Sequence, residues 1–509
     1  MKQLIHNGVL VPKPYEAKGF HIYYKGRKLE LSPHQEEMAY AWVKKLGTEY
    51  VKDRIFVKNF FRDFCSALNI EEEAKPEDFD FSEIQRYVEG EAEKKLRLTK
   101  EEKKQIAQAR KEEREKNKEI YGYVVVDGLK MEVSNYVVEP PSIFMGRGKH
   151  PLRGMWKYGA GKEDVILNLS PNAPVPEGNW KEVVWQPDCM WIAKWNDKLS
   201  GKTKYVWLAD SSNIKQEKEK EKFNKARKLE REIDDVRRKI WDGLKAEDEK
   251  RRKIATVCYL IDELKLRVGD EKDEDEADTV GATTLEPRHI SIGSNGHVTF
   301  DFIGKDYVKW RKEVDLPEPV VDNLREYASI AESSMFEGVR SEDVNEFLNE
   351  AMPGLTAKVF RTYHASKTVR DYLERAKVRK SSPEFEKKHV AKMANLEAAI
   401  TCNHKRKIPK RWKESLRSKE ERVKKFELQI RLKKTENAKK RAREALKKAQ
   451  LNVRLMKSTK EYNLGTSLKS YIDPCVYYDW GRKVGFDWKL YYPKTLQKKF
   501  SWVEKKRES

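Results

Sequence analysis

The 509-residue sequence is poor in cysteine, and its few cysteines form no pattern that suggests a structural metal site. None of them belongs to a C-x-x-C pair, the spacing that is typical of zinc sites. Dense disulfide frameworks are a feature of small secreted domains. We therefore expect ordinary buried thiols and a reducing compartment. The five cysteines are Cys65, Cys189, Cys258, Cys402 and Cys475.

The sequence also lacks the signatures of nucleotide binding, membrane spanning and metal binding. It has no G-x-x-x-x-G-K-[ST] pattern, so ATP use is not indicated. No apolar stretch is long enough to span a bilayer, and residues 1–6 do not begin a signal-peptide apolar core. The acidic run at 270–278 lacks the glycine and the ligand spacing of a calcium loop. We predict no metal, no cofactor and no membrane partner.

Positive charge is what the chain has in excess. It contains 106 Lys and Arg against 84 Asp and Glu, a formal net charge of +22, and its pI is about 9.4. This balance favours a polyanionic partner, with nucleic acid as the first candidate and an anionic membrane surface as the alternative. The length suits roughly three or four domains of ~150 residues. The 38% hydrophobic content suits separate cores joined by charged helices.

The first part of the chain, up to about residue 212, has a mixed pattern. Short β-like runs occur at 19–24 and 121–126. Between them, Thr99 and Glu102 form a capping box that opens a strongly charged helix. Tryptophans and prolines are dense from 140 to 207, which indicates a compact β-rich unit with basic loops.

The later part is mainly helical. Residues 215–266 follow a helical pattern, and helical patterns return after about residue 310 and continue to about 404. Residues 298–310 read as a β-hairpin with its turn at 304–306. The fold class we predict is therefore a mixed α/β multidomain protein, with a β-rich part followed by a mainly helical part that contains one hairpin.

A short segment at 410–457 holds more than half of the excess charge. It has 19 Lys or Arg and 6 Asp or Glu, a net of +13. Apolar residues recur at 4-3 spacing on both sides of a turn near 435–437, which predicts an antiparallel coiled-coil hairpin. Two interpretations stay open: a solvated spacer, or a basic arm that contacts DNA.

Tyr471 lies in the segment SLKSYIDP at 467–474, after a long and very basic helical region. A tyrosine hydroxyl becomes a phosphodiester nucleophile only where cationic donors gather around the phosphate. Attack on a phosphodiester builds negative charge on the non-bridging oxygens, and the 5′ oxygen leaves poorly unless it is protonated. Two-metal nucleases solve both problems with cations held by carboxylates. This sequence shows no convincing carboxylate cluster, so fixed Arg, His and Lys donors are the alternative.

Five segments in the same order resemble the active-site segments of eukaryotic-type type IB DNA topoisomerases. They are LKLRVG at 264–269, FDFIGKD at 300–306, LTAKVFRTY at 355–363, AITCNH at 399–404, and LGTS at 464–467 followed by YIDP at 471–474. A single matching residue would be weak evidence, because most such residues are surface ion pairs or packing residues. Five matches in order, each with flanking identity, make chance resemblance negligible.

The resemblance implies a role for each residue. Tyr471 attacks phosphorus and leaves a 3′-phosphotyrosine and a free 5′-hydroxyl. Arg267 and Arg361 donate to the non-bridging oxygens, and His404 donates a further hydrogen bond. Lys305, at the hairpin tip, protonates the leaving oxygen from the minor groove.

The resemblance also extends to the N-terminal part. EPP at 139–141, GRG at 146–148 and the following His150-Pro151 match the family, which implies a cap lobe ending near residue 212. The DNA-contacting residues implied are Arg147 beside the scissile step, Lys149, Asp306 and Ser470. We predict four domains: 1–212 (N-terminal core and cap lobe), 213–407 (catalytic core), 408–457 (basic coiled-coil linker) and 458–509 (C-terminal domain with the tyrosine).

Two departures from the family pattern bear on location and chemistry. The long charged N-terminal tail of nuclear members is not seen, so we expect a compact archaeal-like member in the cytoplasm at the nucleoid, with the nucleus as the alternative. Ser470 replaces the asparagine that usually precedes the nucleophile in eukaryotic members, and we expect cleavage to survive this change.

The function predicted is that of a monomeric clamp on double-stranded DNA, bound largely through its phosphates. It nicks one strand, permits rotation and reseals, without ATP or an obligatory metal. The alternatives are a tyrosine recombinase, which uses a similar residue set, and a DNA clamp without enzymatic activity.

Overall fold

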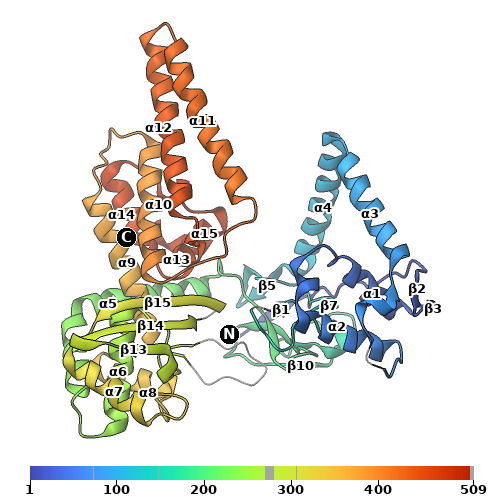
Figure 1. The fold of residues 1–509 in the computed structure, drawn as a ribbon, viewed down its shortest axis with the longest axis horizontal. Coiled ribbons are helices and arrows are strands. Elements are labelled where there is room, and N and C mark those ends of the chain that lie inside the picture. Colours follow the sequence, from blue (N-terminus) through green and yellow to red (C-terminus); the bar gives the residue numbers. More distant parts are fainter. Residues whose placement is uncertain (73, 147, 270–279, 305–306, 505–509) are drawn as a thin grey trace. The chain divides into compact units, whose positions relative to one another are not determined.

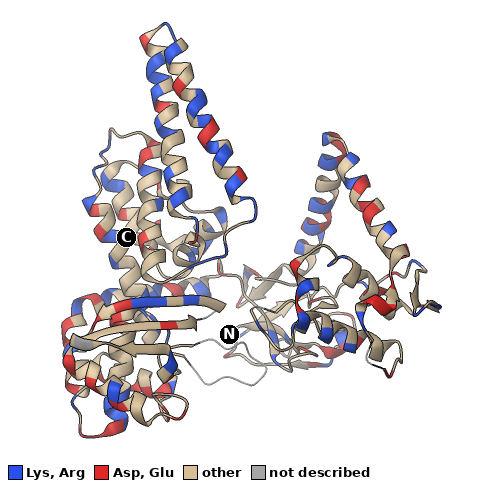
Figure 2. Ribbon diagram, in the orientation of Figure 1, with Lys and Arg blue, Asp and Glu red and all other residues tan. Residues whose placement is uncertain are grey.

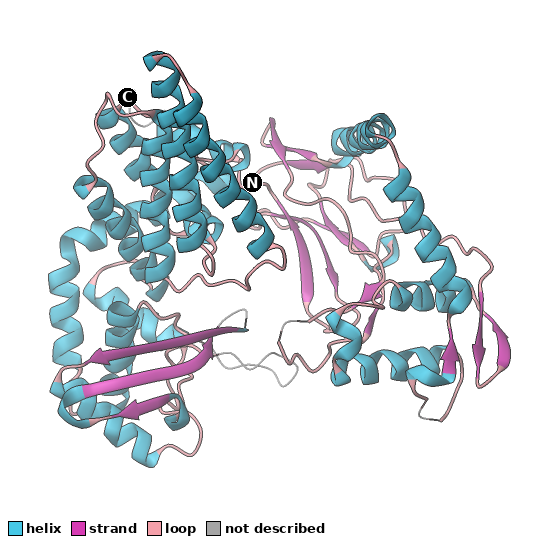
Figure 3. Ribbon diagram, turned by 45° about the horizontal axis from the view of Figure 1, so that its top comes forward, coloured by secondary structure: helices cyan, strands magenta, loops and turns pink. Residues whose placement is uncertain are grey.

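The structure is a computed structural model that describes residues 1–504 except 73, 147, 270–279 and 305–306. The chain divides into two compact units, Met1–Lys215 and Gln216–Lys272 with Thr279–Ser509. Both units contain helices and small sheets (Figures 1 and 3), so the predicted mixed α/β class is confirmed. The division into a cap lobe, a catalytic lobe and a coiled-coil linker stays a prediction.

The described residues of the first unit form four small sheets. Their orders are β1-β5-β6, β3-β2-β4, β10-β9-β11-β12 and β7-β8. The strands are β1 Leu4–His6, β2 His21–Tyr24, β3 Arg27–Glu30, β4 Phe79–Asp80, β5 Tyr123–Val126, β6 Leu129–Glu132, β7 Ser142–Ile143, β8 Trp156–Lys157, β9 Ile166–Asn168, β10 Glu182–Val184, β11 Trp191–Asn196 and β12 Thr203–Trp207. The predicted β-runs at 19–24 and 121–126 therefore correspond to β2 and β5.

Among the described residues of this unit, α-helices accompany these sheets. They are α1 Pro33–Val43, α2 Arg54–Ala67, α3 Ser82–Arg97 and α4 Lys100–Tyr121. Helices α1 and α2 bury an aromatic cluster that includes Trp42, whose ring stacks on Phe60 with centroids 4.7 Å apart. The predicted capping box of α4 is present, because Thr99 accepts from the Glu102 amide and Glu102 accepts from the Thr99 amide.

In the second unit, one three-stranded sheet is covered by helices. The strands β13 Ile290–Ile292, β14 His297–Gly304 and β15 Val308–Asp315 run antiparallel in that order. Strands β14 and β15 form the predicted hairpin. The first helices of this unit are α5 Asn213–Gly243, α6 Glu249–Leu264, α7 Glu318–Ile330, α8 Ser341–Ala351 and α9 Ala357–Arg375.

The helical pattern predicted for 215–266 is interrupted. Helix α5 ends at Gly243, and α6 begins after Asp248, whose carboxylate accepts from the Arg251 amide at 2.8 Å. The reason is local: an N-cap carboxylate satisfies an amide that has no partner in the first helical turn. This break lets α5 and α6 pack against each other, so Arg237 of α5 pairs with Asp262 of α6 at 2.8 Å.

The last helices form a second core around Tyr471. They are α10 Glu384–Thr401, α13 Leu464–Ser470, α14 Pro474–Val484 and α15 Lys494–Lys499. The core combines aliphatic and aromatic side chains, and Tyr471, Ile472, Tyr477 and Trp480 all belong to it. Burying an aromatic or aliphatic side chain of this kind contributes about 1.5–3 kcal/mol, so the chain around the tyrosine is firmly packed.

Helices α11 Trp412–Leu432 and α12 Glu436–Ser458 pack along each other as a basic hairpin. Figure 2 shows Lys and Arg along both helices. The turn lies where the sequence predicted it, with Thr435 capping α12 by accepting from the Ala438 amide. The apolar seam is thin, because α11 has no buried residue and α12 buries only Ala442 and Ala449. The coiled-coil assignment therefore stays a prediction.

None of the helices among the described residues combines the length and the hydropathy needed to cross a membrane.

Candidate active site

The second unit brings four of the predicted catalytic residues together. Arg267 follows α6, Arg361 lies in the first turns of α9, His404 follows α10, and Tyr471 follows α13. They are far apart in sequence and meet because the ends of these four helices converge. Arg267, Arg361 and His404 each lie against Tyr471.

Tyr471 is surrounded by cations and by an imidazole. Its hydroxyl accepts a hydrogen bond from Arg267 Nη1 at 3.1 Å. The Arg361 guanidinium carbon lies 5.1 Å from the centroid of the tyrosine ring, a cation–π distance. The His404 ring centroid is 5.2 Å from the same ring. The phenol is only 5% exposed, so its orientation is fixed by packing on every side.

Arg361 is held by backbone carbonyls. Its Nη1 donates to the Lys265 carbonyl at 2.6 Å, and its Nη2 donates to the Cys402 carbonyl at 2.9 Å. Lys265 is the C-cap of α6 and adopts a left-handed conformation with φ 59°. The guanidinium is therefore fixed in direction while its charge is retained.

Neither Arg267 nor Arg361 has a carboxylate partner within the part of the chain that the structure describes. Two cations in a partly buried place, without a counter-charge among these residues, form a favourable site for an anion. Phosphate oxygens suit such guanidinium groups, which donate in a planar fork.

His404 is a neutral imidazole. Burial, aided by the charges of Arg361 and Arg267, lowers its pKa to about 3. Its Nε2 lies 3.3 Å from Arg361 Nη2, and because a guanidinium only donates, Nε2 is the acceptor. The proton is then on Nδ1, which is buried and has no hydrogen-bond partner among the described residues. The site thus holds one further N–H donor.

The hairpin β14–β15 approaches the same site. Gly304 and Val308, on either side of its tip, line a cavity together with Arg267, Arg361 and His404. Three predicted residues, Lys305, Asp306 and Arg147, lie outside the described residues. Their roles therefore stay predictions.

The two remaining predicted DNA contacts are described. Lys149 is exposed in the first unit, in a turn where Arg153 Nη1 donates to the Gly148 carbonyl at 2.7 Å. Ser470 is the last residue of α13, and its carbonyl accepts from Lys222 Nζ at 3.0 Å. A DNA contact for either of them stays a prediction.

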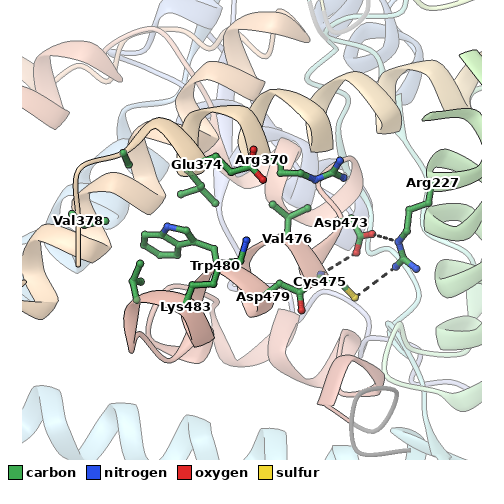
Figure 4. Close-up of a pocket in the computed structure, with 13 residues that line it drawn as sticks. Arg227, Arg370, Glu374, Val378, Asp473, Cys475, Val476, Asp479, Trp480 and Lys483 are labelled. Atoms are coloured by element: carbon green, nitrogen blue, oxygen red, sulfur yellow. Dashed lines mark hydrogen bonds and ion pairs between the residues drawn. The ribbon is translucent and has the colours of Figure 1, made fainter. Parts of the chain in front are cut away.

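Sequence reasoning missed the residues that fix the chain just after Tyr471. Figure 4 shows Arg227 of α5 reaching Asp473 at the start of α14 and the neighbouring Cys475. Arg227 Nε donates to Asp473 Oδ2 at 2.7 Å, and Asp473 Oδ1 accepts from the Cys475 amide at 2.9 Å. An Asp-Pro pair at the start of a helix is a recognisable N-cap signal, but nothing in the sequence marks Arg227 as its partner.

In chemical terms the site offers a phenol nucleophile, two guanidinium groups and an imidazole N–H. No group of His, Cys, Asp and Glu among the described residues is arranged to hold a metal ion. The donor set fits a reaction at an anionic phosphorus centre, in which cations and N–H donors stabilise the developing charge.

Comparison with known families covers nearly the whole chain. Residues 1–208 match the DNA binding fragment of eukaryotic DNA topoisomerase I, 211–437 match its catalytic core, and 443–509 match the C-terminal topoisomerase domain.

Individual relatives agree with this. The chain is 35% identical over 525 residues to DNA topoisomerase 1 of Drosophila melanogaster, covering 98% of this chain and 54% of that protein. It is 34% identical over 548 residues to the human protein of the same name, covering 99% of this chain and 70% of that protein. DNA topoisomerase 1 beta of Arabidopsis thaliana is 35% identical over 539 residues, covering 99% of this chain and 58% of that protein. The chain belongs to the eukaryotic DNA topoisomerase I family, which comprises isomerases of type IB.

Proposed function

We propose that this chain is a type IB DNA topoisomerase that relaxes positive and negative supercoils. It cuts one strand of duplex DNA through Tyr471, lets the free end rotate and reseals the strand, without ATP or an obligatory metal. The observation that carries the proposal is the 3.1 Å hydrogen bond from Arg267 to the Tyr471 hydroxyl, beside a second, carbonyl-anchored arginine. Family membership supports the reaction type.

The cleavage step would proceed as follows. The Tyr471 oxygen forms a bond to phosphorus, and the bond from phosphorus to the 5′ oxygen breaks. The phenol proton passes to solvent water, and the leaving 5′ oxygen gains a proton from Lys305. Arg267, Arg361 and the Nδ1–H of His404 donate to the non-bridging oxygens, whose charge rises in the transition state.

Resealing is the reverse reaction. The 5′-hydroxyl attacks the phosphotyrosine and displaces Tyr471, so the number of phosphodiester bonds is conserved. Since the energy of the broken bond is retained in the covalent intermediate, no ATP is required. The network that positions the phenol for attack also holds it for release.

The partner in this proposal is double-stranded DNA, bound mainly through phosphates by a monomer. The net charge of +22 supports it, and affinity should fall steeply with salt. Phosphate contacts position without specifying sequence, so cleavage preference should be modest. Lys149, Arg147, Asp306 and Ser470 are proposed as further DNA contacts.

The same proposal includes the architecture and the compartment. A cap lobe at 1–212 and a catalytic lobe at 213–407 would form the clamp, 408–457 would be a coiled-coil linker, and 458–509 would present the nucleophile. The protein would act where the chromosome lies, at a cytoplasmic archaeal nucleoid or, alternatively, in a nucleus.

Plasmid relaxation tests the proposal directly. Wild-type protein and Tyr471→Phe are incubated with negatively and with positively supercoiled plasmid in EDTA, without ATP. Relaxation of both signs by wild type, together with its loss in Tyr471→Phe, is the expected result. Absence of relaxation by folded, DNA-binding wild type would reject the proposal in favour of a recombinase or a non-enzymatic clamp.

A further inference from the structure

The backbone around Tyr471 is held by side chains from three different helices. Three successive carbonyls each accept a hydrogen bond. The carbonyl of Lys469 accepts from Lys499 Nζ of α15 at 3.2 Å, and that of Ser470 accepts from Lys222 Nζ of α5 at 3.0 Å. The carbonyl of Tyr471 itself accepts from Ser366 Oγ of α9 at 3.2 Å.

The first two contacts occupy the C-terminal end of α13, where helix carbonyls lack intrahelical partners. Cations are favoured there because the helix dipole places partial negative charge at that end. Glu219 lies 2.7 Å from the ammonium of Lys222 and 3.3 Å from that of Lys499, so one carboxylate orients both lysines. The last turn before the nucleophile is thereby fixed.

Ser366 makes a different contact, because its hydroxyl bridges two points of the chain. While Oγ donates to the Tyr471 carbonyl, it also accepts from the Asp473 amide at 2.9 Å. Ser366 is buried, with 5% of its surface exposed. A single hydroxyl therefore spans Ile472 and sets the direction in which the backbone leaves the tyrosine.

Ser366 also belongs to the helix that bears Arg361. The two residues are five positions apart in α9, about 7.5 Å along the axis at 1.5 Å per residue. Helix α9 is continuous from Ala357 to Arg375. The same rigid element thus holds the nucleophile's backbone at one place and presents a cation against its ring at another.

We propose that Ser366 is a positioning residue for the strand-cleavage reaction: its hydroxyl locks the backbone of Tyr471 to α9 and so sets the phenol against Arg361 and Arg267. Lys222 supports it by fixing the Ser470 carbonyl. This inference rests on the proposed function, since it assigns these residues a role in presenting the nucleophile. Neither residue is expected to touch DNA.

The test is the rate at which covalent protein–DNA adduct forms in a single turnover. Full-length protein in excess over end-labelled duplex is quenched with denaturant at timed intervals, and duplex affinity is measured separately. We expect Ser366→Ala to slow adduct formation by about 10- to 100-fold, the scale of a misplacement of roughly 1 Å. Duplex affinity should stay within about twofold of wild type, since phosphate contacts are unchanged.

Two matched variants separate positioning from simple loss of stability. Ser366→Thr keeps a hydroxyl at the same place and should recover most of the rate. Thr368→Val removes a hydroxyl from the same helix that makes no side-chain hydrogen bond among the described residues, and should react like wild type. A Ser366→Ala protein that reacts at the wild-type rate overturns the inference, as does a Ser366→Thr protein no faster than Ser366→Ala.

A second variant covers the case in which Ser366→Ala does not fold. Lys222→Met removes the ammonium from the Ser470 carbonyl, and we expect it to slow adduct formation about 10-fold with unchanged affinity. Lys220→Met, at an exposed ion pair two residues away, is its control. Equal rates for Lys222→Met and Lys220→Met would contradict the supporting role of Lys222 and, with it, the inference.

A sulfur-containing substrate distinguishes a defect in positioning the nucleophile from a defect in protonating the leaving group. The substrate carries sulfur in place of the bridging 5′ oxygen, at a cleavage position first mapped with the wild-type protein. Sulfur is a good leaving group even when it is not protonated. It should rescue Lys305→Ala and leave Ser366→Ala slow; full rescue of Ser366→Ala would overturn the inference. Failure of wild type to form any adduct would instead reject the proposed function itself.

Discussion

The hairpin of α11 and α12 and the surroundings of Tyr471 are both basic, but they present their charge in opposite ways. Residues 410–457 have a net charge of +13, and their cations are largely exposed; the Arg417 side chain, for example, is 83% exposed. Near Tyr471 there are two arginines, and Arg361 is 6% exposed.

The difference in exposure suggests that the hairpin contributes to DNA affinity, whereas the buried arginine contributes to the rate of cleavage. Exposed cations act on a polyanion collectively and at a distance, and salt screens them. A buried guanidinium fixed by two carbonyls acts on one phosphate group, and its effect depends on position. Many charges on the hairpin should therefore matter less to the cleavage rate than one arginine at the tyrosine.

The largest expected effect is that of Arg361. Arg361→Ala should lower the cleavage rate by about 10²–10³-fold, the range found when one preorganised donor is removed from a transition state. Duplex affinity should change little. Single-turnover adduct formation and equilibrium binding at one salt concentration measure the two quantities.

The control for this prediction is Arg370→Ala. Arg370 lies on the same helix and pairs with Glu230 at 2.5 Å. It should cleave at the wild-type rate. Equal losses of binding and cleavage in Arg361→Ala would make Arg361 a binding residue. Because the substitution leaves the Lys265 and Cys402 carbonyls unpaired, thermal unfolding must accompany the assay.

The hairpin should show the reverse behaviour. Replacing the exposed Lys413, Lys424, Lys425 and Lys433 by glutamine should weaken duplex binding about 10-fold or more at moderate salt and flatten the dependence of log Kd on log salt. Cleavage at saturating DNA should not change. Binding titrations at several salt concentrations, with single-turnover cleavage, test both halves.

Helix α4 supplies a matched comparison for the hairpin. It is equally exposed but has eight Lys or Arg against six Glu, so its net charge is small. Four lysine-to-glutamine changes there, at Lys100, Lys103, Lys104 and Lys111, should shift the salt dependence less. A slower cleavage step at saturating DNA in the hairpin variant would show that the hairpin takes part in the chemistry.

His404 predicts a pH effect on stability. Its pKa is about 3 in the folded protein and 6.5 ordinarily, so the unfolded chain binds the proton more readily between these values. The free energy of unfolding should therefore fall as pH drops from about 6.5 towards 3, by up to about 1.4 kcal/mol per pH unit from this group.

Denaturant unfolding of wild type and His404→Gln across this pH window isolates the contribution of His404. His6, His34, His364 and His389 also have lowered pKa values because each is at least partly buried, so wild type minus variant is the informative difference. Parallel pH profiles for the two proteins would show that His404 titrates normally in the folded state.

The smallest effect is expected for an ion pair on the hairpin. Lys457 and Glu420 join α12 to α11 at 2.7 Å, with side chains 55% and 42% exposed. Exposed pairs contribute about 0–1 kcal/mol, so Lys457→Gln should leave the melting temperature and the cleavage rate nearly unchanged. A clear loss of stability would indicate that the thin apolar seam depends on this pair.

Much of the fold could be predicted from local patterns. The hairpin β14–β15 followed from strand alternation around a glycine-containing turn, and the start of α4 followed from the Thr99–Glu102 capping box. The break between α5 and α6 was missed, although Asp248 is an ordinary N-cap residue. Charged, helix-favouring residues continue on both sides of Asp248, so the sequence was interpreted as one uninterrupted helical region.

Only part of the candidate site could be predicted from the sequence. Tyr471, Arg267, Arg361 and His404 stand in recognisable segments, and the structure brings them into contact, while their catalytic roles stay predictions. The carbonyls of Lys265 and Cys402, which hold Arg361, have no side-chain signature at all. Ser366 and Lys222 donate hydrogen bonds to backbone carbonyls of residues that are distant in the sequence. No sequence motif specifies such a contact, so these two residues could not be predicted.

The carbonyl anchoring of Arg361 has a consequence for how the free protein responds to its solution. Two guanidinium groups that have only neutral acceptors among the described residues repel each other when nothing anionic is bound. Any small oxyanion that enters between them relieves that repulsion and binds only the folded form. Inorganic phosphate or sulfate should therefore raise the melting temperature of this protein beyond the effect of chloride at equal ionic strength, and the buffer chosen for storage becomes a partial substitute for the DNA backbone.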